Sequence, residues 1–259
     1  GSSKTESTTA ANAETKVEAE GESKAEAADG SDIHVGIIFT EAGLSGNSFN
    51  DLALEGVKKA ADDYGITYDE VEPKSVSDEE IIQDEMASSG EYDLIICVGA
   101  EQVDALTNVA TTYPDQKFAL LDANSDLDNV ASYSCKEQEG AFLAGALAVL
   151  AKQEKIDDKL NDGKVIGFIG VNLNQNEIAP DYIMASMLKK LDSCAYHAIT
   201  SVVEGTYTGE NQVLGLSDGG VDVTTEKSNI QVSDSIKEQL DDLKAKVISG
   251  EIEVPYELK

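Results

Sequence analysis

Polar side chains and one aromatic ring come directly after the first apolar run of the chain, residues 35–39. The run gives way to a loop rich in Gly, Ser and Asn, and an amphipathic pattern begins where the loop ends. The loop supplies four candidate ligand contacts: Asn47, Ser48, Phe49 and Asn50. Open α/β sheets bind ligands at the carboxyl ends of their strands, where backbone N–H groups and small polar side chains can hold a small molecule. Phe49 could stack on a ligand ring or pack into the core, and its position alone leaves both open.

Asp122 is a second candidate, because it ends the apolar run 118–121 and is expected at the same edge of the sheet. Its carboxylate could accept hydrogen bonds from ligand N–H or O–H groups, or it could cap a turn. The loop 122–128 has oxygen-bearing side chains at its first, third and fifth positions, as calcium loops do. However, Leu127 stands where an EF-hand needs Gly, and Tyr133 stands where it needs Glu. We therefore expect a polar loop and no metal site.

Residues that serve nucleophilic catalysis are sparse. The two histidines, His34 and His197, are expected at a strand start and within a helix, and neither stands at a strand exit beside a nucleophile. Without a base next to a nucleophile no triad can be assembled, and the HExxH, GxSxG and Walker A patterns are absent. Cys97, Cys135 and Cys194 have no CxxC spacing, so we expect buried, inert thiols. The sequence predicts no enzyme and no cofactor.

The charge of the chain excludes nucleic acid as a partner. The formal net charge is −31, and all 19 basic residues are Lys. Such a chain repels phosphate backbones and lacks the bidentate Arg clamp. The longest apolar stretch, residues 141–151, is too short to span a bilayer.

Residues 1–32 differ in composition from everything that follows. They contain no aromatic residue, and Val17 is their only branched aliphatic residue. Such a segment cannot bury enough apolar surface to offset its ordering entropy, so we expect it to be disordered. It could be an acidic tether that holds a binding domain off a cell surface or a solubilising tail, and composition leaves both open. No initiator Met and no signal peptide are present, which leads us to expect a processed or trimmed product.

Strands and helices alternate over residues 33–152. The expected strands are 33–39, 66–71, 92–98, 117–121 and 130–134, and the expected helices are 49–64, 77–88, 101–113 and 138–152. In the second helix Ser77 and Glu80 have the spacing of a capping box. The alternation predicts βαβ units and a parallel sheet, with an N-terminal α/β ligand-binding domain over 33–135.

The alternation thins over residues 136–259, where we expect a hinge helix and a shortened second domain with a C-terminal helix. The expected elements are strands 164–170 and 182–187, a helix 188–204, a hairpin of 213–216 and 221–223 around the turn 217–220, and a helix 233–249. This part supplies far fewer βα units than the first.

Several motifs, taken in order, carry a resemblance to a known family. They include Gly-Leu-Ser-Gly-Asn-Ser-Phe-Asn at 43–50, Tyr-Asp-Leu-Ile-Ile-Cys-Val-Gly at 92–99, Tyr-Pro-Asp-Gln-Lys-Phe-Ala at 113–119 and Gly-Leu-Ser-Asp-Gly-Gly-Val at 215–221. Together they resemble the basic-membrane-protein family of bacterial lipoproteins, of the purine-nucleoside receptor type. The resemblance implies a type I periplasmic-binding-protein fold, in which two α/β domains close on a ligand. It also implies an extracytoplasmic receptor for an ABC transporter permease, held to the cytoplasmic membrane by a lipid on a Cys before the tether.

The resemblance also implies roles for individual residues. Phe49 would stack on the purine, Asp122 would hydrogen-bond the base, and Asn172 and Lys189 would contact the ribose. Two departures concern these contacts. Ser-Gly-Asn at 45–47 stands where the family usually has Asn-Asp-Lys, and Asn172 and Asn174 replace both carboxylates of the family's GVDxDQ motif. Hydrogen bonds to a neutral amide are about half as strong as those to a carboxylate, which weakens the expected grip on the sugar.

A larger departure lies at residues 165–175, where the start of the second domain is fused directly to the GVDxDQ-like motif. At about thirty residues for each βαβ unit, on the order of ninety residues are missing from the second domain. We therefore expect a truncated second α/β domain and weakened affinity for purine nucleosides such as inosine, guanosine or adenosine. The alternatives are a structural or interaction remnant that binds none of them, and an enzyme acting through Asp122, which has no visible partner base. The exposed sheet edges could be covered in a homodimer.

Overall fold

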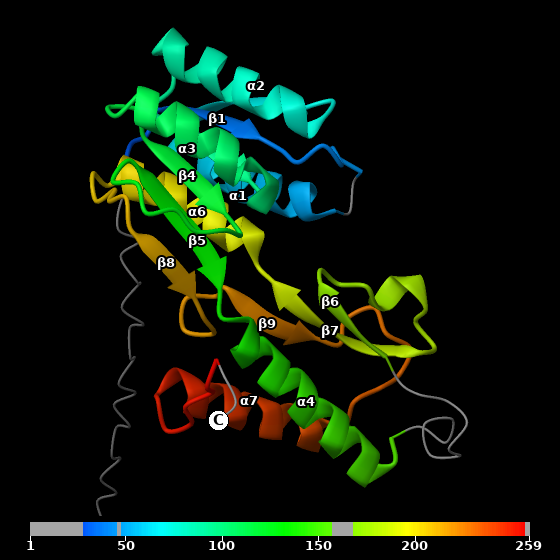
Figure 1. The fold of residues 1–259 in the computed structure, drawn as a ribbon. Helices are drawn as coiled ribbons and strands as arrows, with labels where there is room; N and C mark the ends of the chain where they lie inside the picture. Colours follow the sequence, from blue (N-terminus) through cyan, green and yellow to red (C-terminus); the bar gives the residue numbers. More distant parts are fainter. Residues whose placement is uncertain (1–27, 46–47, 157–167, 257–259) are drawn as a thin grey trace, which may run out of the picture.

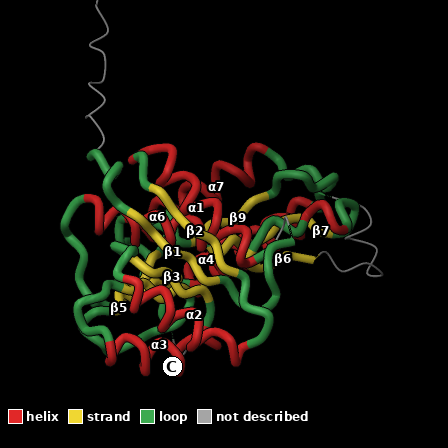
Figure 2. The backbone as a smooth tube through the Cα atoms, turned by 90° about the horizontal axis from the view of Figure 1, so that it is seen from above, coloured by secondary structure: helices red, strands yellow, loops and turns green. Residues whose placement is uncertain are grey.

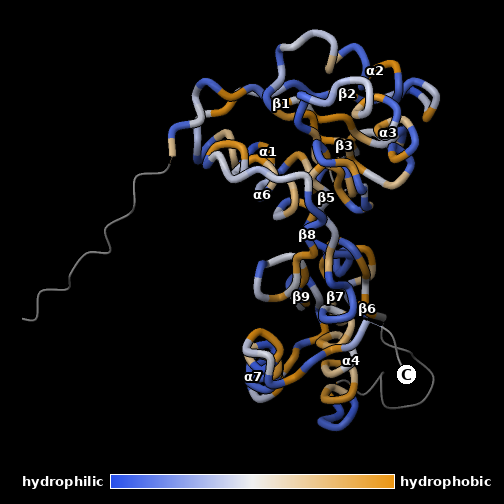
Figure 3. The backbone as a smooth tube through the Cα atoms, turned by 60° about the vertical axis from the view of Figure 1, so that its left-hand side comes forward, coloured by the Kyte–Doolittle hydropathy of each residue, from blue (hydrophilic) through white to orange (hydrophobic). Residues whose placement is uncertain are grey.

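The computed structural model describes residues 28–45, 48–156 and 168–256. Asn47, most of the predicted tether and the first residues of the strand predicted at 164–170 lie outside this part of the chain. The described residues form two α/β lobes joined by a narrow waist (Figures 1 and 3). The predicted tether ends before residue 30, because Gly30 is buried and its N–H donates to the carbonyl of Tyr64 at 2.8 Å.

The first lobe is built on a six-stranded sheet in the order β2-β1-β3-β4-β5-β8, and every neighbouring pair is parallel. Its strands are β1 (His34–Ile38), β2 (Thr67–Val71), β3 (Leu94–Val98), β4 (Phe118–Leu121), β5 (Val130–Cys135) and β8 (Asn211–Leu214). The continuous apolar runs that predicted buried strands therefore form the centre of a parallel sheet, which is covered on both faces. The predicted α/β fold with a parallel sheet in its N-terminal part is confirmed.

Helices cover both faces of this sheet (Figure 2). The helices are α1 (Phe49–Tyr64) and α6 (Leu191–Val203) on one face, and α2 (Val76–Ser89) and α3 (Val103–Thr112) on the other; the short 3-10 helix η1 (Ala100–Gln102) precedes α3. Successive side chains of a strand point to opposite faces. In β3, Leu94, Ile96 and Val98 accordingly pack with α1 and α6, whereas Ile95 and Cys97 pack with α2 and α3.

The second lobe has a smaller sheet, in the order β6-β7-β9. Its strands are β6 (Phe168–Asn172), β7 (Ile183–Lys189) and β9 (Val221–Thr224), with the 3-10 helix η2 (Asn176–Ile178) between the first two. β6 and β7 are parallel, and β9 is antiparallel to β7. α4 (Glu137–Glu154) and α7 (Asp234–Ile248) lie together on one face of this sheet (Figures 1 and 3). The second sheet therefore has half as many strands as the first.

The predicted hairpin around residues 217–220 is wrong. Leu214 of β8 pairs with Cys135 of β5 in the first sheet, whereas Val221 of β9 pairs with Lys189 of β7 in the second. The intervening loop folds on itself, because the N–H of Gly220 donates to the carbonyl of Gly215 at 2.8 Å. The turn residues thus carry the chain from one sheet to the other instead of reversing it within one sheet.

The helix boundaries differ from the prediction at two places. The second helix begins one residue earlier than expected, with Ser75 at the N-cap position, so Ser77 lies inside the helix and the predicted capping box with Glu80 is wrong. The helix expected over 188–204 begins at Leu191, because β7 continues to Lys189.

The chain crosses the waist three times: between β5 and α4, between β7 and α6, and between β8 and β9. The crossings are tied to each other, because the N–H of Lys136 donates to the carbonyl of Leu214 at 2.8 Å and the N–H of Lys190 donates to Gly220 at 2.9 Å. The first lobe therefore includes α6 and β8 in addition to the predicted range 33–135. None of the helices in the described part of the chain is long and apolar enough to cross a membrane.

Candidate functional site

The carboxyl edge of the first sheet gathers the loops that follow β1, β3 and β4, because parallel strands end at the same edge. Asp122 lies at this edge, one residue beyond β4. Its backbone has a φ of 68°, a left-handed conformation that is uncommon outside Gly and recurs at functional sites. The N–H of Asp122 donates to the carbonyl of Tyr133 at 2.8 Å, which fixes the residue against β5.

The loop after β1 is held together by two of the predicted ligand contacts. Ser48 is the N-cap of α1: its Oγ accepts from the N–H of Asp51 at 3.3 Å, and its own N–H donates to Asp51 Oδ2 at 2.9 Å. Asn50 is buried, and its Nδ2 donates to Thr40 Oγ1 at 3.0 Å and to the carbonyl of Gly43 at 2.8 Å. These bonds use the polar atoms of both side chains to shape the loop, which makes Ser48 and Asn50 positioning residues in this arrangement.

Phe49 begins α1 and is half-buried. It packs against the apolar core shared by α1, α6 and the sheet. Phe49 is therefore partly packed in the core and partly exposed, which leaves both of the roles considered for it open.

Lys189 joins the two lobes at the waist. It is the last residue of β7, and its side chain is 10 % exposed. Its Nζ lies 2.6 Å from Asp122 Oδ1 and 2.6 Å from Oε1 of Glu137, the first residue of α4. Two of the predicted site residues, which come from different sheets, are thus in direct contact.

The electrostatics of this cluster favour a charged ammonium. Burial by itself lowers the pKa of Lys189, but hydrogen bonds to Asp122 and Glu137 and the charges of these two carboxylates outweigh the burial and raise it above its ordinary value. Lys189 is therefore a fixed positive charge between a carboxylate of the first lobe and a carboxylate of the hinge helix.

Asn172 lies at the end of β6, where it pairs with Leu188 of β7. It is exposed and has a φ of 76°, so two of the predicted site residues share the left-handed backbone conformation. β6 and β7 are parallel and adjacent, which places Asn172 and Lys189 at the same edge of the second sheet. Asn174 serves the local loop instead, since its Nδ2 donates to the carbonyl of Glu226 at 3.2 Å and its Oδ1 accepts from the N–H of Asn176 at 3.0 Å.

Glu137 was missed by the sequence analysis. The available signal was its place in the first turn of the hinge helix, where a carboxylate is favoured by the helix dipole. That signal is common to many helices and does not identify a neighbour of Lys189.

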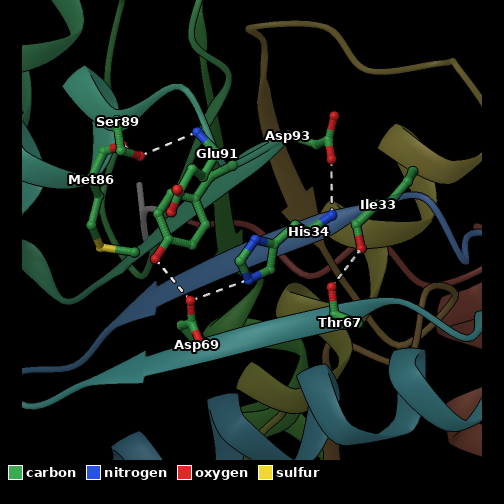
Figure 4. A network of polar contacts seen from close by, with 9 residues as sticks. Ile33, His34, Thr67, Asp69, Met86, Ser89, Glu91 and Asp93 are labelled. Carbon is green, nitrogen blue, oxygen red and sulfur yellow. Dashed lines mark hydrogen bonds and ion pairs between the residues drawn. The ribbon is translucent and has the colours of Figure 1, made fainter.

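The first histidine lies at the opposite edge of the first sheet, at the start of β1 (Figure 4). His34 Nε2 is 3.2 Å from Asp69 Oδ2, which also accepts from the hydroxyl of Tyr92 at 2.9 Å. The backbone N–H of His34 donates to Asp93 Oδ2 at 2.8 Å. This network ties β1, β2 and the start of β3 together, which gives His34 a structural role. Among the described residues, no group of three or more His, Cys, Asp or Glu is gathered as a metal site would require.

The chain matches the model of a known protein family over most of its length. The model of the Bmp family, described as PnrA-like ABC transporter substrate-binding proteins, matches residues 33–160 and 156–257. An uncharacterized lipoprotein of Pyrococcus abyssi is 37% identical over 118 residues, which are 45% of this chain and 29% of the relative. Basic membrane protein A of Borreliella burgdorferi is 31% identical over 146 residues, 54% of this chain and 40% of the relative.

A solved structure shares the fold over most of the chain. The solute-binding protein of an ABC transporter system from Aeropyrum pernix K1 is 25% identical, with a TM-score of 0.66, and the match covers 87% of this chain and 94% of that protein. In contrast, the chain spans less than a third of the length of the Pyrococcus relative. The predicted periplasmic-binding-protein-like architecture is confirmed.

Proposed function

The chain belongs to the Bmp family of PnrA-like ABC transporter substrate-binding proteins, and we propose that it binds purine nucleosides at the carboxyl edge of its first sheet for delivery to an ABC importer. We further propose that the protein works outside the cytoplasmic membrane, held there by a lipid anchor before the acidic leader. Relatives that are lipoproteins support this location. Recognition without chemistry fits the site, since Asp122 and Glu137 are both paired with the ammonium of Lys189.

The contact between Asp122 and Lys189, at 2.6 Å, is the observation that carries the proposal. A receptor of two lobes needs polar groups from both lobes at one place, and this contact brings a carboxylate of the first lobe to an ammonium of the second. In the proposed complex a base N–H or a ribose hydroxyl donates to Asp122. Lys189 keeps its second carboxylate, Glu137, and therefore does not become a buried unpaired charge.

Phe49 supplies the apolar part of the proposed site. A purine stacked on its accessible face gains about 1 kcal/mol beyond the area that it buries. Asn172 adds a neutral amide on the side of the second lobe, at the same sheet edge as Lys189.

We propose that the affinity is weakened by a shortened second lobe. Its sheet has three strands where the first has six. The family model matches in two stretches rather than one, which supports an internal deletion. A smaller wall buries less ligand surface, and pockets of solute-binding proteins depend on that burial.

Titration calorimetry with inosine, guanosine and adenosine tests the proposal. We expect measurable binding of at least one of them, and Asp122→Asn should weaken it roughly tenfold or more, because a hydrogen bond to a charged group contributes about 1.5–3 kcal/mol. The matched control is Asp126→Asn, an exposed carboxylate in the same loop, which should leave binding unchanged. For the ring, Phe49→Leu should weaken binding, and Phe142→Leu on α4 should not.

The rival function is a structural or interaction remnant that binds no nucleoside. The existing pairing of Asp122 with Lys189 favours it, because a ligand must compete with that ion pair. Absence of heat with all three nucleosides, for a protein with a cooperative unfolding transition, would replace the receptor proposal by this one. Binding as tight as that of a family member of full length would refute the weakened affinity, and released base after long incubation would indicate an enzyme.

A further inference from the structure

Two of the three cysteines meet at the waist. Cys135 is the last residue of β5 and Cys194 lies in the first turn of α6, and their Sγ atoms are 3.9 Å apart. Both are free thiols. Cys194 is 1% exposed, whereas Cys135 is half-buried, so a small molecule can reach the pair only through Cys135.

The spacing suits a bond between the two sulfurs. A disulfide has a sulfur–sulfur distance of about 2.05 Å, so the two sulfurs, which are 3.9 Å apart, need to approach by only about 2 Å to form one. Cys97 offers a contrast within the same chain, since it is fully buried in the centre of β3 on the other face of the sheet. Its sulfur makes no contact with another thiol of the described residues.

The surroundings give the two thiols different reactivity. The hydrogen bond from Cys194 lowers the pKa of Cys135; burial and Asp122 oppose this effect, and the charge of Lys189 supports it. The same contact, together with burial, raises the pKa of Cys194. The thiolate is the nucleophile in cysteine oxidation, so Cys135 is the attacking residue and Cys194 is the resolving one.

We propose that Cys135 and Cys194 form a reversible intramolecular disulfide when the protein meets hydrogen peroxide. The Cys135 thiolate attacks one peroxide oxygen, so that an S–O bond forms, the O–O bond breaks and hydroxide leaves. The sulfur of Cys194 then attacks the resulting sulfenic acid, so that the S–S bond forms, the S–O bond breaks and water leaves. Overall two thiols lose two electrons and two protons, and one peroxide becomes two waters.

The bond would form beside the chain crossings at the waist. Cys135 precedes the first crossing directly, and Cys194 follows the second crossing within one helical turn. The third crossing is already hydrogen-bonded to both, through Lys136 and Lys190. Oxidation would therefore add a covalent link within the first lobe, between the ends of β5 and α6 that face the waist. This role does not depend on which ligand the protein binds.

Oxidation of the reduced protein with hydrogen peroxide, followed by peptide mapping of the non-reduced protein, tests the proposal. We expect a monomer that has lost two hydrogen atoms, a peptide pair joined through Cys135 and Cys194, and full recovery with a thiol reductant. The oxidised monomer should melt roughly 5–10 °C higher, because the bond restricts the unfolded chain between residues 135 and 194.

Three variants complete the design. Cys97→Ala should still form the bond. Cys135→Ser should keep its Cys194 thiol, whereas Cys194→Ser should be oxidised at Cys135 without forming the bond, and neither serine variant should show a rise in melting temperature. Disulfide-linked dimers only, oxidation at Cys97, or sulfinic acid at Cys135 with Cys194 unchanged would overturn the proposal. The mapping of the unaltered protein decides the question even where a serine variant fails to fold.

Discussion

A buried carboxylate in α2 makes the stability of the first lobe depend on pH. Glu79 is fully buried, and neither of its carboxylate oxygens has a hydrogen-bond partner among the described residues. Burial raises the pKa of Glu79 to about 7, with smaller contributions from the negative charges of Glu101 and Glu41. A buried charge without a partner is destabilising, so the protonated form is the one that the fold favours.

The sign of the effect follows from the direction of the shift. In the unfolded chain Glu79 titrates near 4.5, so between about pH 4.5 and about pH 7 the folded protein holds the extra proton. The ionisation of Glu79 therefore costs the least stability at the acid end of this window, and the cost grows as the pH rises through it. A rise in pKa from 4.5 to about 7 corresponds to about 3 kcal/mol at a pH above both values.

Glu79→Gln removes this penalty. At about pH 8 the variant should be more stable than the unaltered protein by about 2 kcal/mol, less than the full amount because its buried amide also lacks partners. At about pH 4.5 the gain should vanish. Urea unfolding followed by circular dichroism across this range measures the difference.

Glu85→Gln is the matched control, since Glu85 is exposed on the same helix. It should change stability little and equally at every pH. A gain for Glu79→Gln that is the same at both ends of the pH range, or a gain of equal size for Glu85→Gln, would refute the reasoning. The reasoning would also be refuted if, between about pH 5 and about pH 7, the stability of the unaltered protein rose relative to that of Glu79→Gln.

Further predictions concern packing, the waist and backbone strain. A Cβ at Gly56 of α1 would lie 2.1 Å from the backbone oxygen of Asp192, so Gly56→Ala should destabilise the protein by about 2 kcal/mol or more in chemical unfolding. Gly145→Ala in α4 has open space and should stabilise it by about 0.5–1 kcal/mol, which makes it the matched helical control. Lys189→Met leaves two carboxylates without their shared cation and should lower stability by about 1–2 kcal/mol near neutral pH in chemical unfolding. Asn172→Ala should be about 1 kcal/mol less stable than Asn172→Gly, because a φ of 76° suits Gly; equal stabilities would contradict the strain.

The elements of the first lobe could be predicted because each depends on a local pattern. The buried runs that became β3 and β4 needed only their apolar continuity, and Gly65 at the end of α1 adopts the left-handed φ of 77° that such a stop requires. The position of Asp122 followed from the same logic, since it stands directly after a buried strand. The failures were in long-range pairing: the turn chemistry of residues 217–220 indicates a reversal but not which sheet each flanking strand joins.

The contact between the two lobes could be foreseen only in part from the sequence. Asp122 and Lys189 were both singled out, but their direct contact, and the part of Glu137 in it, depend on how the crossings bring the two sheets together. The meeting of Cys135 and Cys194 has the same origin, because their spacing in the sequence matches no disulfide or metal motif. Local patterns specify which residue types stand at a strand end, and tertiary structure decides which ends meet.

In the proposed receptor, ligand binding would be coupled to the placement of the two lobes at the waist. Lys189 is bound at once to a residue of the first sheet and to the hinge helix, and it is itself the last residue of a strand in the second sheet. A ligand that takes Asp122 must therefore weaken a contact between the lobes, while Glu137 keeps the ammonium at the hinge. Closure of the lobes on a ligand would have to replace the contact between Asp122 and Lys189. The free energy of binding would therefore include the difference in free energy between the structure that has this contact and the closed structure. The affinity of the proposed site should therefore respond to substitution of Lys189 and of either of its two carboxylates.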